Sequence, residues 1–292
     1  MGDVNNTTYA TEFYDSGNYY QHYVKTGFII RVTTYVIITI GLLLILLTIF
    51  ALYFLVRKDH VTPIYVINLL ITDLFQFCCL IFFNTKGSWI FGIVGSIVYY
   101  TYYCLLVTSV GFMVCISLER YLVIAHPLWY RFRRTTKISV AVCAVVWVVP
   151  PVFFIPVVYL LGLEVQGIIF SISLIVPFPL FIFFLVGTLR ALSASVSVPS
   201  EEKRRIVGIL VLVLLIYTLL FLPSIIYYLA QGSGSFDLSN LSSMFIRLSP
   251  LADLSLYVFI RKDISSKFLA AVCCCKMESN ANDEPAVKVD DV

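Results

Sequence analysis

Long, unbroken apolar stretches, such as residues 35–56, 138–161 and 206–229, decide what this chain can fold into. A helix that rises 1.5 Å per residue crosses a bilayer in about 20 residues, and each stretch reaches that length. Charged residues make up only 13% of the chain, far below the share in soluble domains, so a water-soluble fold is excluded. The stretches do not alternate apolar with polar residues, which excludes a membrane β-barrel. The sequence therefore predicts an all-α membrane protein.

Seven membrane-spanning helices are predicted, at residues 28–56, 62–83, 93–124, 137–161, 166–192, 202–230 and 241–260. Basic residues concentrate in the first, third and fifth connections and after the seventh span, and such segments stay in the cytoplasm. The amino terminus is therefore expected outside the cell and the carboxyl terminus inside, in a multi-pass protein of the plasma membrane. We divide the chain into an extracellular tail (1–27), a seven-helix bundle (28–260), a juxtamembrane amphipathic helix (261–276) and a disordered cytoplasmic tail (277–292).

Candidate modification sites agree with this orientation. Sequons for N-glycosylation begin at Asn5, Asn6 and Asn240, all in segments expected outside. The amphipathic helix ends in a cysteine triplet, a typical acceptor for palmitoylation: Cys273, Cys274 and Cys275. The basic loops are expected to contact membrane lipids. A net charge of +3, scattered along the chain, does not indicate a nucleic-acid partner.

Four short strings carry recognisable chemistry. The third span ends in Glu119-Arg120-Tyr121, where a carboxylate beside a guanidinium can hold the arginine in one state and release it to a partner in another. The second span carries Asn68 and, five residues later, Asp73, an ionisable group at mid-bilayer that must face the bundle interior. The sixth span contains Phe221-Leu222-Pro223, and the seventh reads Asp253-Leu254-Ser255-Leu256-Tyr257.

Together these strings make residues 29–276 resemble the rhodopsin-like (class A) G-protein-coupled receptors. The sequence is similar to an orphan-type member that lacks the usual extracellular disulfide. The resemblance implies a receptor that binds an extracellular ligand and activates heterotrimeric G proteins. It also implies a G-protein contact surface, made of Glu119, Arg120, Tyr121, Pro127, Leu128 and Arg205. By the same resemblance the activation switch comprises Phe221, Pro223, Asp253 and Tyr257, and an allosteric sodium ion lies among Asp73, Ser109, Ser249 and Asp253.

The sequence departs from the family pattern at several positions. Leu254 replaces a proline of the seventh span, Gly187 stands where a fifth-span tyrosine is usual, and the first span has no asparagine. No cysteine lies where the disulfide would join the third span to the second extracellular loop, which is short (162–166). These departures weaken the expectation of standard activation and predict an extracellular face held by packing alone.

Arg247 is the most informative candidate for ligand binding, because it lies too deep in the seventh span to reach the membrane surface easily. It needs an anion, either Asp73 or Asp253 inside the bundle or a carboxylate or phosphate on a ligand. We favour a small anionic or lipid-like ligand. The cavity would be completed by polar and aromatic residues, although an aromatic stripe is also typical of simple packing: Gln76, Tyr99, Tyr102, Tyr103, Tyr227, Tyr228 and Met244.

Other functions remain open at this stage. A tyrosine-rich acidic tail (9–23) is also typical of peptide receptors, and the altered seventh-span string suits a scavenger that binds without signalling. A transporter would show internal repeats with broken helices, and no such similarity relates the two halves. The sequence predicts neither an enzyme nor a cofactor other than the sodium ion.

Overall fold

The computed structural model describes residues 24–50, 64–85, 92–126, 128, 130, 136–161, 163–194, 200–230 and 236–260. The predicted amphipathic helix, both tails, Asn5, Asn6, Pro127 and the cysteine triplet lie outside these residues. The described helices are the first helix (Val24–Phe50), α2 (Ile64–Asn84), α3 (Ile93–Ala125), α5 (Thr136–Leu161), α6 (Leu163–Ile175), α7 (Pro177–Ala194), α8 (Ser200–Leu229) and α9 (Phe236–Ile260).

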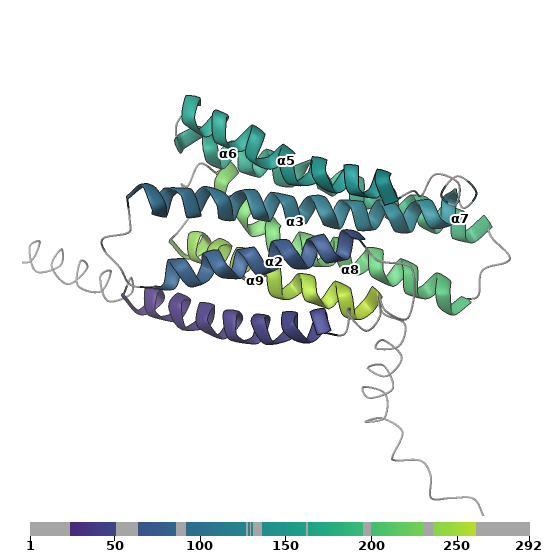
Figure 1. Cartoon of the computed structure of the whole chain (residues 1–292), viewed down its shortest axis with the longest axis horizontal. Coiled ribbons are helices and arrows are strands. Elements are labelled where there is room, and N and C mark those ends of the chain that lie inside the picture. Colours follow the sequence, from purple (N-terminus) through teal and green to yellow (C-terminus); the bar gives the residue numbers. More distant parts are fainter. Residues whose placement is uncertain are drawn as a thin grey trace, which may run out of the picture.

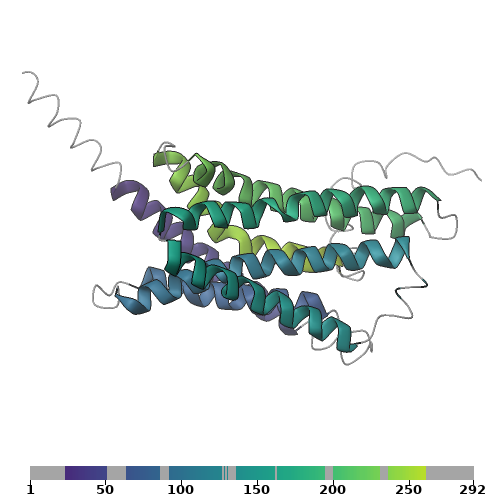
Figure 2. The same cartoon turned by 90° about the horizontal axis from the view of Figure 1, so that it is seen from above.

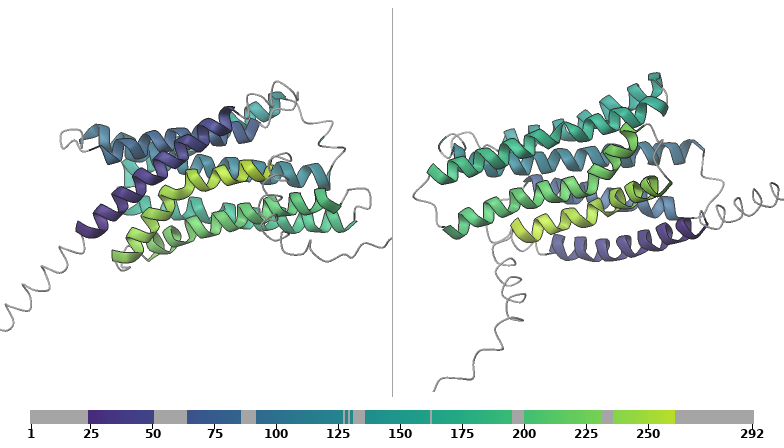
Figure 3. Two further views of the ribbon diagram at one scale, coloured as in Figure 1. Left: turned by 90° about the horizontal axis from the view of Figure 1, so that it is seen from below. Right: turned by 180° about the vertical axis from the view of Figure 1, so that it is seen from behind.

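The helices form one elongated bundle around α3. This helix contacts α2, α5, α6, α7 and α8. Figure 1 shows the first helix, in purple, along one edge of the bundle and α5 along the opposite edge. Seen from above in Figure 2, and from below and behind in Figure 3, the helices keep the same lengthwise arrangement, with the first helix crossing its neighbours obliquely. Side chains on α3 therefore face nearly every other part of the molecule.

Six helical segments in the described part of the chain are long and apolar enough to cross a membrane. They are Val24–Phe50, Ile64–Asn84, Ile93–Ala125, Lys137–Pro156, Gln166–Ser193 and Ile206–Leu229. Helix α9 packs against α2 and α8 but is more polar, because Arg247, Asp253 and several serines lie on it. The predicted all-α, multi-pass membrane bundle is confirmed by these helices.

Some of the described helices extend beyond the predicted spans. The first helix begins at Val24 rather than at residue 28, and α9 begins at Phe236 rather than at residue 241, so Asn240 lies within a helix. The connection predicted at 162–166 is almost entirely helical, since α5 ends at Leu161 and α6 begins at Leu163. Hydropathy marks where a helix is apolar, whereas a helix extends as far as its backbone hydrogen bonds can be formed, which is why polar ends were missed.

The predicted fifth span is interrupted. Helix α6 ends at Ile175, Val176 forms a turn, and α7 begins at Pro177. Proline lacks a backbone N–H and its ring clashes with the preceding turn, so it interrupts a helix but suits the first position of the next one. This break leaves carbonyl groups at the end of α6 that need donors from elsewhere.

The first helix packs closely on α2 through a glycine. A Cβ atom added to Gly41 would collide with Cζ of Phe77, a side chain that is fully buried. Small residues allow two membrane helices to approach in this way. The absence of a side chain at Gly41 therefore allows the contact with Phe77 that positions the first helix on the bundle.

Gly41→Ala is expected to destabilise the protein by about 1–3 kcal/mol, because the added methyl group overpacks the contact with Phe77. Thermal unfolding of the purified protein in detergent measures the effect. Gly208→Ala is the matched control, since a Cβ atom there meets nothing within 4 Å. A melting temperature that falls equally in both variants, or in neither, would contradict the close contact.

Candidate functional site

Polar side chains occupy the bundle interior at three levels. The level of Arg120 lies near the end of α3, and we call this end of the molecule the Arg120 end. The other end, where α3 begins and α2 finishes, is called the Arg247 end. A pair of buried carboxyl groups, Asp73 and Asp253, lies on the neighbouring helices α2 and α9 between these two ends.

The carboxyl groups of Asp73 and Asp253 are buried and close enough to interact electrostatically. Among the described residues, none of their four oxygen atoms has a hydrogen-bond partner. The hydroxyl group of Ser249, one turn before Asp253, also lacks a partner there. Ser109 on α3 is fully buried and donates to the carbonyl oxygen of Leu106 at 2.9 Å, so its oxygen can still accept or coordinate.

These four side chains form an oxygen-only set with two potential negative charges. Two carboxylates facing each other repel, so one of them must hold a proton unless a cation neutralises both. Carboxylate and hydroxyl oxygens suit hard cations rather than soft ones. The unpartnered buried oxygens thus fit a single hard cation, the group that the sequence predicts here.

Arg247 is half-buried on α9, and its Nη1 atom donates a hydrogen bond to the Thr34 hydroxyl of the first helix at 2.9 Å. No acidic side chain in the described part of the chain pairs with it, and the oxygens of Asp73 and Asp253 in particular do not bond it. Of the two interpretations of Arg247, the internal ion pair is therefore absent from the described residues. A neutral hydroxyl leaves the guanidinium charge without compensation.

Tyr102 lies next to Arg247 and fastens α3 to α9. Its hydroxyl group donates to the backbone carbonyl of Ile246 at 3.3 Å. In a regular helix this carbonyl would accept from the N–H of residue 250, but Pro250 has none. The tyrosine thus satisfies a carbonyl that the proline leaves free, and it holds the segment of α9 that carries Arg247.

The other predicted cavity tyrosines pack together in an aromatic cluster with Phe170 of α6. The hydroxyl groups of Tyr103 and Tyr228 lie 3.0 Å apart, and the ring of Phe170 packs against both, with centroids at 4.8 and 5.6 Å. Tyr99 covers Tyr103 at 4.7 Å, and Tyr227 packs on Tyr228 at 5.2 Å. The predicted set therefore divides into an Arg247–Tyr102 part, towards the first helix, and a packed aromatic part, towards α6 and α8.

Two further predicted cavity residues lie inside the bundle. Gln76 is fully buried, and neither atom of its amide group has a hydrogen-bond partner among the described residues. It lies one turn from Asp73 on α2, towards the Arg247 end. Met244 is half-buried, one turn before Arg247. A buried amide without partners is costly, so the amide of Gln76 is a candidate hydrogen-bonding group for a ligand.

At the Arg120 end, the carboxylate of Glu119 accepts a hydrogen bond from the Tyr130 hydroxyl at 2.6 Å. The Nε atom of Arg120 is buried without a partner among the described residues. Tyr121 packs against the rings of Phe183 and Phe184, both at 5.8 Å. Sequence reasoning missed Tyr130, because nothing in its local sequence shows that the chain brings it back to Glu119.

The ring of Tyr121 also fills the space where a side chain on Gly187 would lie. A Cβ atom on Gly187 would lie 2.7 Å from Cε2 of Tyr121. The tyrosine that the family has at this position of the fifth span would not fit beside Tyr121 as it lies here. Leu128, also predicted to contact the G protein, is exposed, and the side chain of Arg205 lies outside the described part.

The predicted switch residues belong to the core. Phe221 is fully buried, and its ring centroid lies 5.1 Å from that of Tyr217. The Tyr217 hydroxyl donates to the carbonyl of Leu174, at the end of α6, where the break before Pro177 leaves carbonyl groups without helical partners. Pro223 lies within α8, and Leu254 is buried where the family has proline. The side chain of Tyr257 lies outside the described part.

A hydrogen bond also joins the motif residues of the second and fourth spans. The indole N–H of Trp147 donates to Asn68 at 2.9 Å. All five cysteines in the described part of the chain are free thiols. They are Cys78, Cys79, Cys104, Cys115 and Cys143.

Comparison with known proteins gives the same family as the motifs. The family model described as "7 transmembrane receptor (rhodopsin family)" matches residues 43–167. Human G-protein coupled receptor 68 is 25% identical over 247 residues, which cover 71% of this chain and 67% of the relative.

Two other receptors match at a similar level. A chicken purinoceptor is 26% identical, with 72% of this chain and 71% of the relative covered. Rat proteinase-activated receptor 2 is 26% identical, with 76% and 66% covered. The matched residues 43–167 contain Glu119-Arg120-Tyr121, Asp73 and the Asn68–Trp147 contact. Residues 43–167 thus match the rhodopsin family of seven-transmembrane receptors, and about 70% of the chain is similar to G-protein-coupled receptors.

Proposed function

We propose that this chain is a cell-surface receptor that binds a small anionic or lipid-like ligand from outside the cell and activates heterotrimeric G proteins. In this proposal α9 is the seventh span, the Arg247 end opens to the outside, and the Arg120 end faces the cytoplasm. The clustering of basic residues in the loops at the Arg120 end supports this orientation.

The half-buried guanidinium of Arg247 carries the proposal for the ligand. Its bonded partner is the neutral hydroxyl of Thr34, so its charge has no counterpart among the described side chains. A carboxylate or phosphate group would supply that charge and could bind the guanidinium fork bidentately. Tyr102 lies beside Arg247, and Met244 lies one turn before it on α9; with the buried Gln76 of α2 they would contact the rest of the ligand.

The packed aromatic part can couple ligand binding to the inner end of the bundle. Tyr103 and Tyr228 connect α3 with α8, and α8 carries Phe221 and Pro223 on towards the Arg120 end. A ligand that binds one arrangement of these helices better than another shifts the population between them. We propose that the active arrangement moves α8 away from α3 and exposes Arg120 to the G protein.

A panel of carboxylated and phosphorylated metabolites and lipids tests this function directly. Cells that express the receptor with each G-protein class are exposed to each compound, and G-protein activation is recorded. We expect an anionic compound to activate and its neutral methyl ester to fail. Saturable binding of the anion without activation of any G-protein class would instead indicate a scavenger, and activation by neutral compounds alone would contradict the role of Arg247.

We further propose that Asp73, Ser109, Ser249 and Asp253 bind one sodium ion in the inactive state. Sodium is expected to lower agonist affinity, because an ion that binds the inactive state better opposes the agonist by linkage. Agonist binding in sodium chloride and in choline chloride at equal ionic strength measures the effect.

Asp73→Asn is expected to abolish the sodium effect, since it removes one of the two charges that hold the ion. Thr72→Ser is the matched control, because Thr72 is also buried on α2 but donates its hydroxyl hydrogen to the carbonyl of Leu69. Agonist binding that is identical in both salts, or that keeps its sodium dependence in Asp73→Asn, would contradict the site.

A further inference from the structure

The charges around Arg247 limit how many negative charges a ligand can bring to it. Helices α2, α3 and α9 carry only one other basic residue, Arg120, which lies at the opposite end of α3. On the first helix, Lys25 and Arg31 are exposed, whereas Thr34, which Arg247 bonds, is buried. The described interior at the Arg247 end therefore offers one positive charge, which one negative charge on a ligand balances.

The buried carboxyl pair of Asp73 and Asp253 opposes a second negative charge on the ligand. Arg247 and Asp253 are six residues apart on α9, which is about 9 Å along the helix axis. The pair keeps one net negative charge when it holds either one proton or one sodium ion. At an effective dielectric constant of about 20, two unit charges about 9 Å apart change an affinity by a factor of about 20. A dianion is therefore disfavoured twice, by the missing second cation and by this repulsion.

The hydroxyl groups beside Arg247 have no hydrogen left for a third oxygen atom of an anion. Thr34 donates its hydroxyl hydrogen to the carbonyl of Ile30 at 2.6 Å and accepts from Arg247. Tyr102 donates to the carbonyl of Ile246 at 3.3 Å. A guanidinium fork presents two parallel N–H groups, which match the two oxygens of a carboxylate. A phosphate or sulfonate group has a third oxygen, to which neither hydroxyl can donate.

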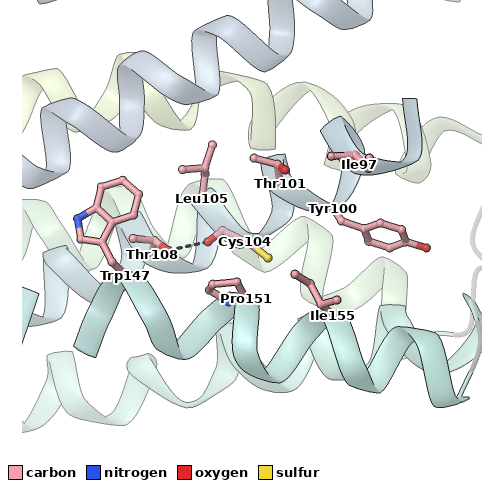
Figure 4. Close-up of a pocket in the computed structure, with 9 residues that line it drawn as sticks. All are labelled: Ile97, Tyr100, Thr101, Cys104, Leu105, Thr108, Trp147, Pro151 and Ile155. Carbon is pink, nitrogen blue, oxygen red and sulfur yellow. Dashed lines mark hydrogen bonds between the residues drawn. The ribbon is translucent and has the colours of Figure 1, made fainter. Parts of the chain in front are cut away.

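A slot of about 320 Å³ between α3 and α5 offers an anion no comparable site (Figure 4). None of the residues that line it is charged. The hydroxyl of Thr108 donates to the carbonyl of Cys104 at 2.8 Å, and the indole N–H of Trp147 is bonded to Asn68 at 2.9 Å. An anion in this slot would be desolvated without a counter-charge. The acid group of a ligand therefore belongs at Arg247.

We propose, building on the function proposed above, that the ligand is a carboxylic acid with a single negative charge, and that phosphate monoesters and dicarboxylates are rejected. The fork of Arg247 binds the two carboxylate oxygens. Thr34 and Tyr102 are buried, so little water reaches this place to screen a second charge. The rest of the ligand is uncharged.

Four probes that share a hexyl chain test this selectivity on the full chain in lipid nanodiscs. They are heptanoate, hexane-1-sulfonate, hexyl phosphate and the neutral heptanamide. The rise in melting temperature with probe concentration gives each dissociation constant, because a ligand of the folded state stabilises it by mass action. At pH 8 we expect heptanoate to bind about tenfold or more tightly than hexyl phosphate, and about threefold more tightly than the sulfonate. Heptanamide should leave the melting temperature unchanged.

The pH dependence of hexyl phosphate binding separates the effect of charge from that of shape. The second proton of a phosphate monoester has a pKa of about 6, so this probe carries two negative charges at pH 8 and mostly one at pH 5. Hexane-1-sulfonate carries one charge at both pH values and controls for changes in the protein. We expect the affinity of hexyl phosphate, relative to the sulfonate, to rise about tenfold from pH 8 to pH 5. A ratio that does not change with pH would overturn the single-charge selectivity.

Met244→Lys should reverse the selectivity. Met244 is half-buried on α9, one turn before Arg247, so lysine adds a second positive charge on the same side of the helix. We expect hexyl phosphate to bind this variant about tenfold or more tightly than wild type at pH 8. Met244→Gln is the matched control, because glutamine is also long and polar but uncharged, and it should keep the wild-type ratio of affinities. An unchanged ratio in Met244→Lys would overturn the proposal, and the pH measurement on wild type decides it if this variant does not fold.

Arg247→Ala separates a failure of this proposal from a failure of the proposed function. If heptanoate and hexyl phosphate bind wild type equally and Arg247→Ala binds neither, the single-charge selectivity is overturned while Arg247 remains the anion site. Heptanoate binding that is unchanged in Arg247→Ala, or equal binding of heptanamide to wild type, would overturn both. Hexane-1-sulfonate that binds as tightly as heptanoate would overturn the carboxylate assignment and support the single charge.

Discussion

Replacing Arg247 with alanine is expected to weaken an acidic agonist by roughly 30-fold or more, with the receptor still present at the cell surface. Truncating one partner of a buried, hydrogen-bonded charge pair costs about 2–5 kcal/mol, because the other charge is left unpaired. Each 1.4 kcal/mol is a factor of about ten in affinity. Displacement of a labelled agonist from membranes measures the change.

Three further variants separate charge from hydrogen bonding. Arg247→Lys should recover only part of the affinity, since an ammonium keeps the charge but loses the planar fork. Thr34→Val removes the bonded partner seen at 2.9 Å and should have a smaller effect than Arg247→Ala. Arg31→Ala, at an exposed position one turn earlier on the first helix, is the control and should leave affinity unchanged. Equal affinity in wild type, Arg247→Ala and Arg247→Lys would remove the reason for preferring acidic ligands.

The partner of Arg247 could not be predicted from the sequence. Thr34 and Arg247 are 213 positions apart, and a threonine in an apolar stretch carries no signal that it faces a distant arginine. The same holds for Tyr130, whose bond to Glu119 depends on how the connection after α3 folds back. Such contacts depend on the relative rotation of helices, which hydropathy and short motifs do not specify.

The helices and the buried carboxyl pair were predictable for physical reasons. Apolar length alone predicts the spans, because a backbone inside lipid must satisfy its own hydrogen bonds. An ionisable side chain at mid-bilayer must face inward, and this brings Asp73 and Asp253 to the same interior. The structure divides the predicted aromatic wall into two parts. Tyr102 and Tyr103 are adjacent in sequence, so they point about 100° apart around α3 and meet different helices.

Arg120→Ala is expected to abolish agonist-stimulated nucleotide exchange on the G protein while surface expression survives. The side chain is half-buried at the end of α3, and its Nε atom has no partner among the described residues, so the substitution breaks no hydrogen bond of that atom. In this account the active state presents the Arg120 guanidinium to the G protein. Neither Glu119 nor Tyr121 carries a positive charge that could replace it. Exchange assays on membranes, with surface receptor counted separately, measure the loss.

Tyr130→Phe is the informative companion variant. It removes the hydroxyl that donates to Glu119 at 2.6 Å but leaves Arg120 in place. We expect it to change basal exchange while agonist-stimulated exchange persists. Undiminished signalling in Arg120→Ala would contradict the assignment of this end of the bundle as the G-protein surface.

The central claim, that an anionic ligand bound at Arg247 activates a G protein at Arg120, is tested most directly in a purified system. Full-length receptor in lipid nanodiscs is mixed with a heterotrimeric G protein, and exchange of GDP for GTP is followed with the anionic agonist and with its methyl ester. The account predicts that the anion accelerates exchange, that the ester does not, and that Arg247→Ala shifts the anion's dose response to higher concentration. Equal acceleration by the anion and the ester, or no acceleration by an anion that binds, would contradict it.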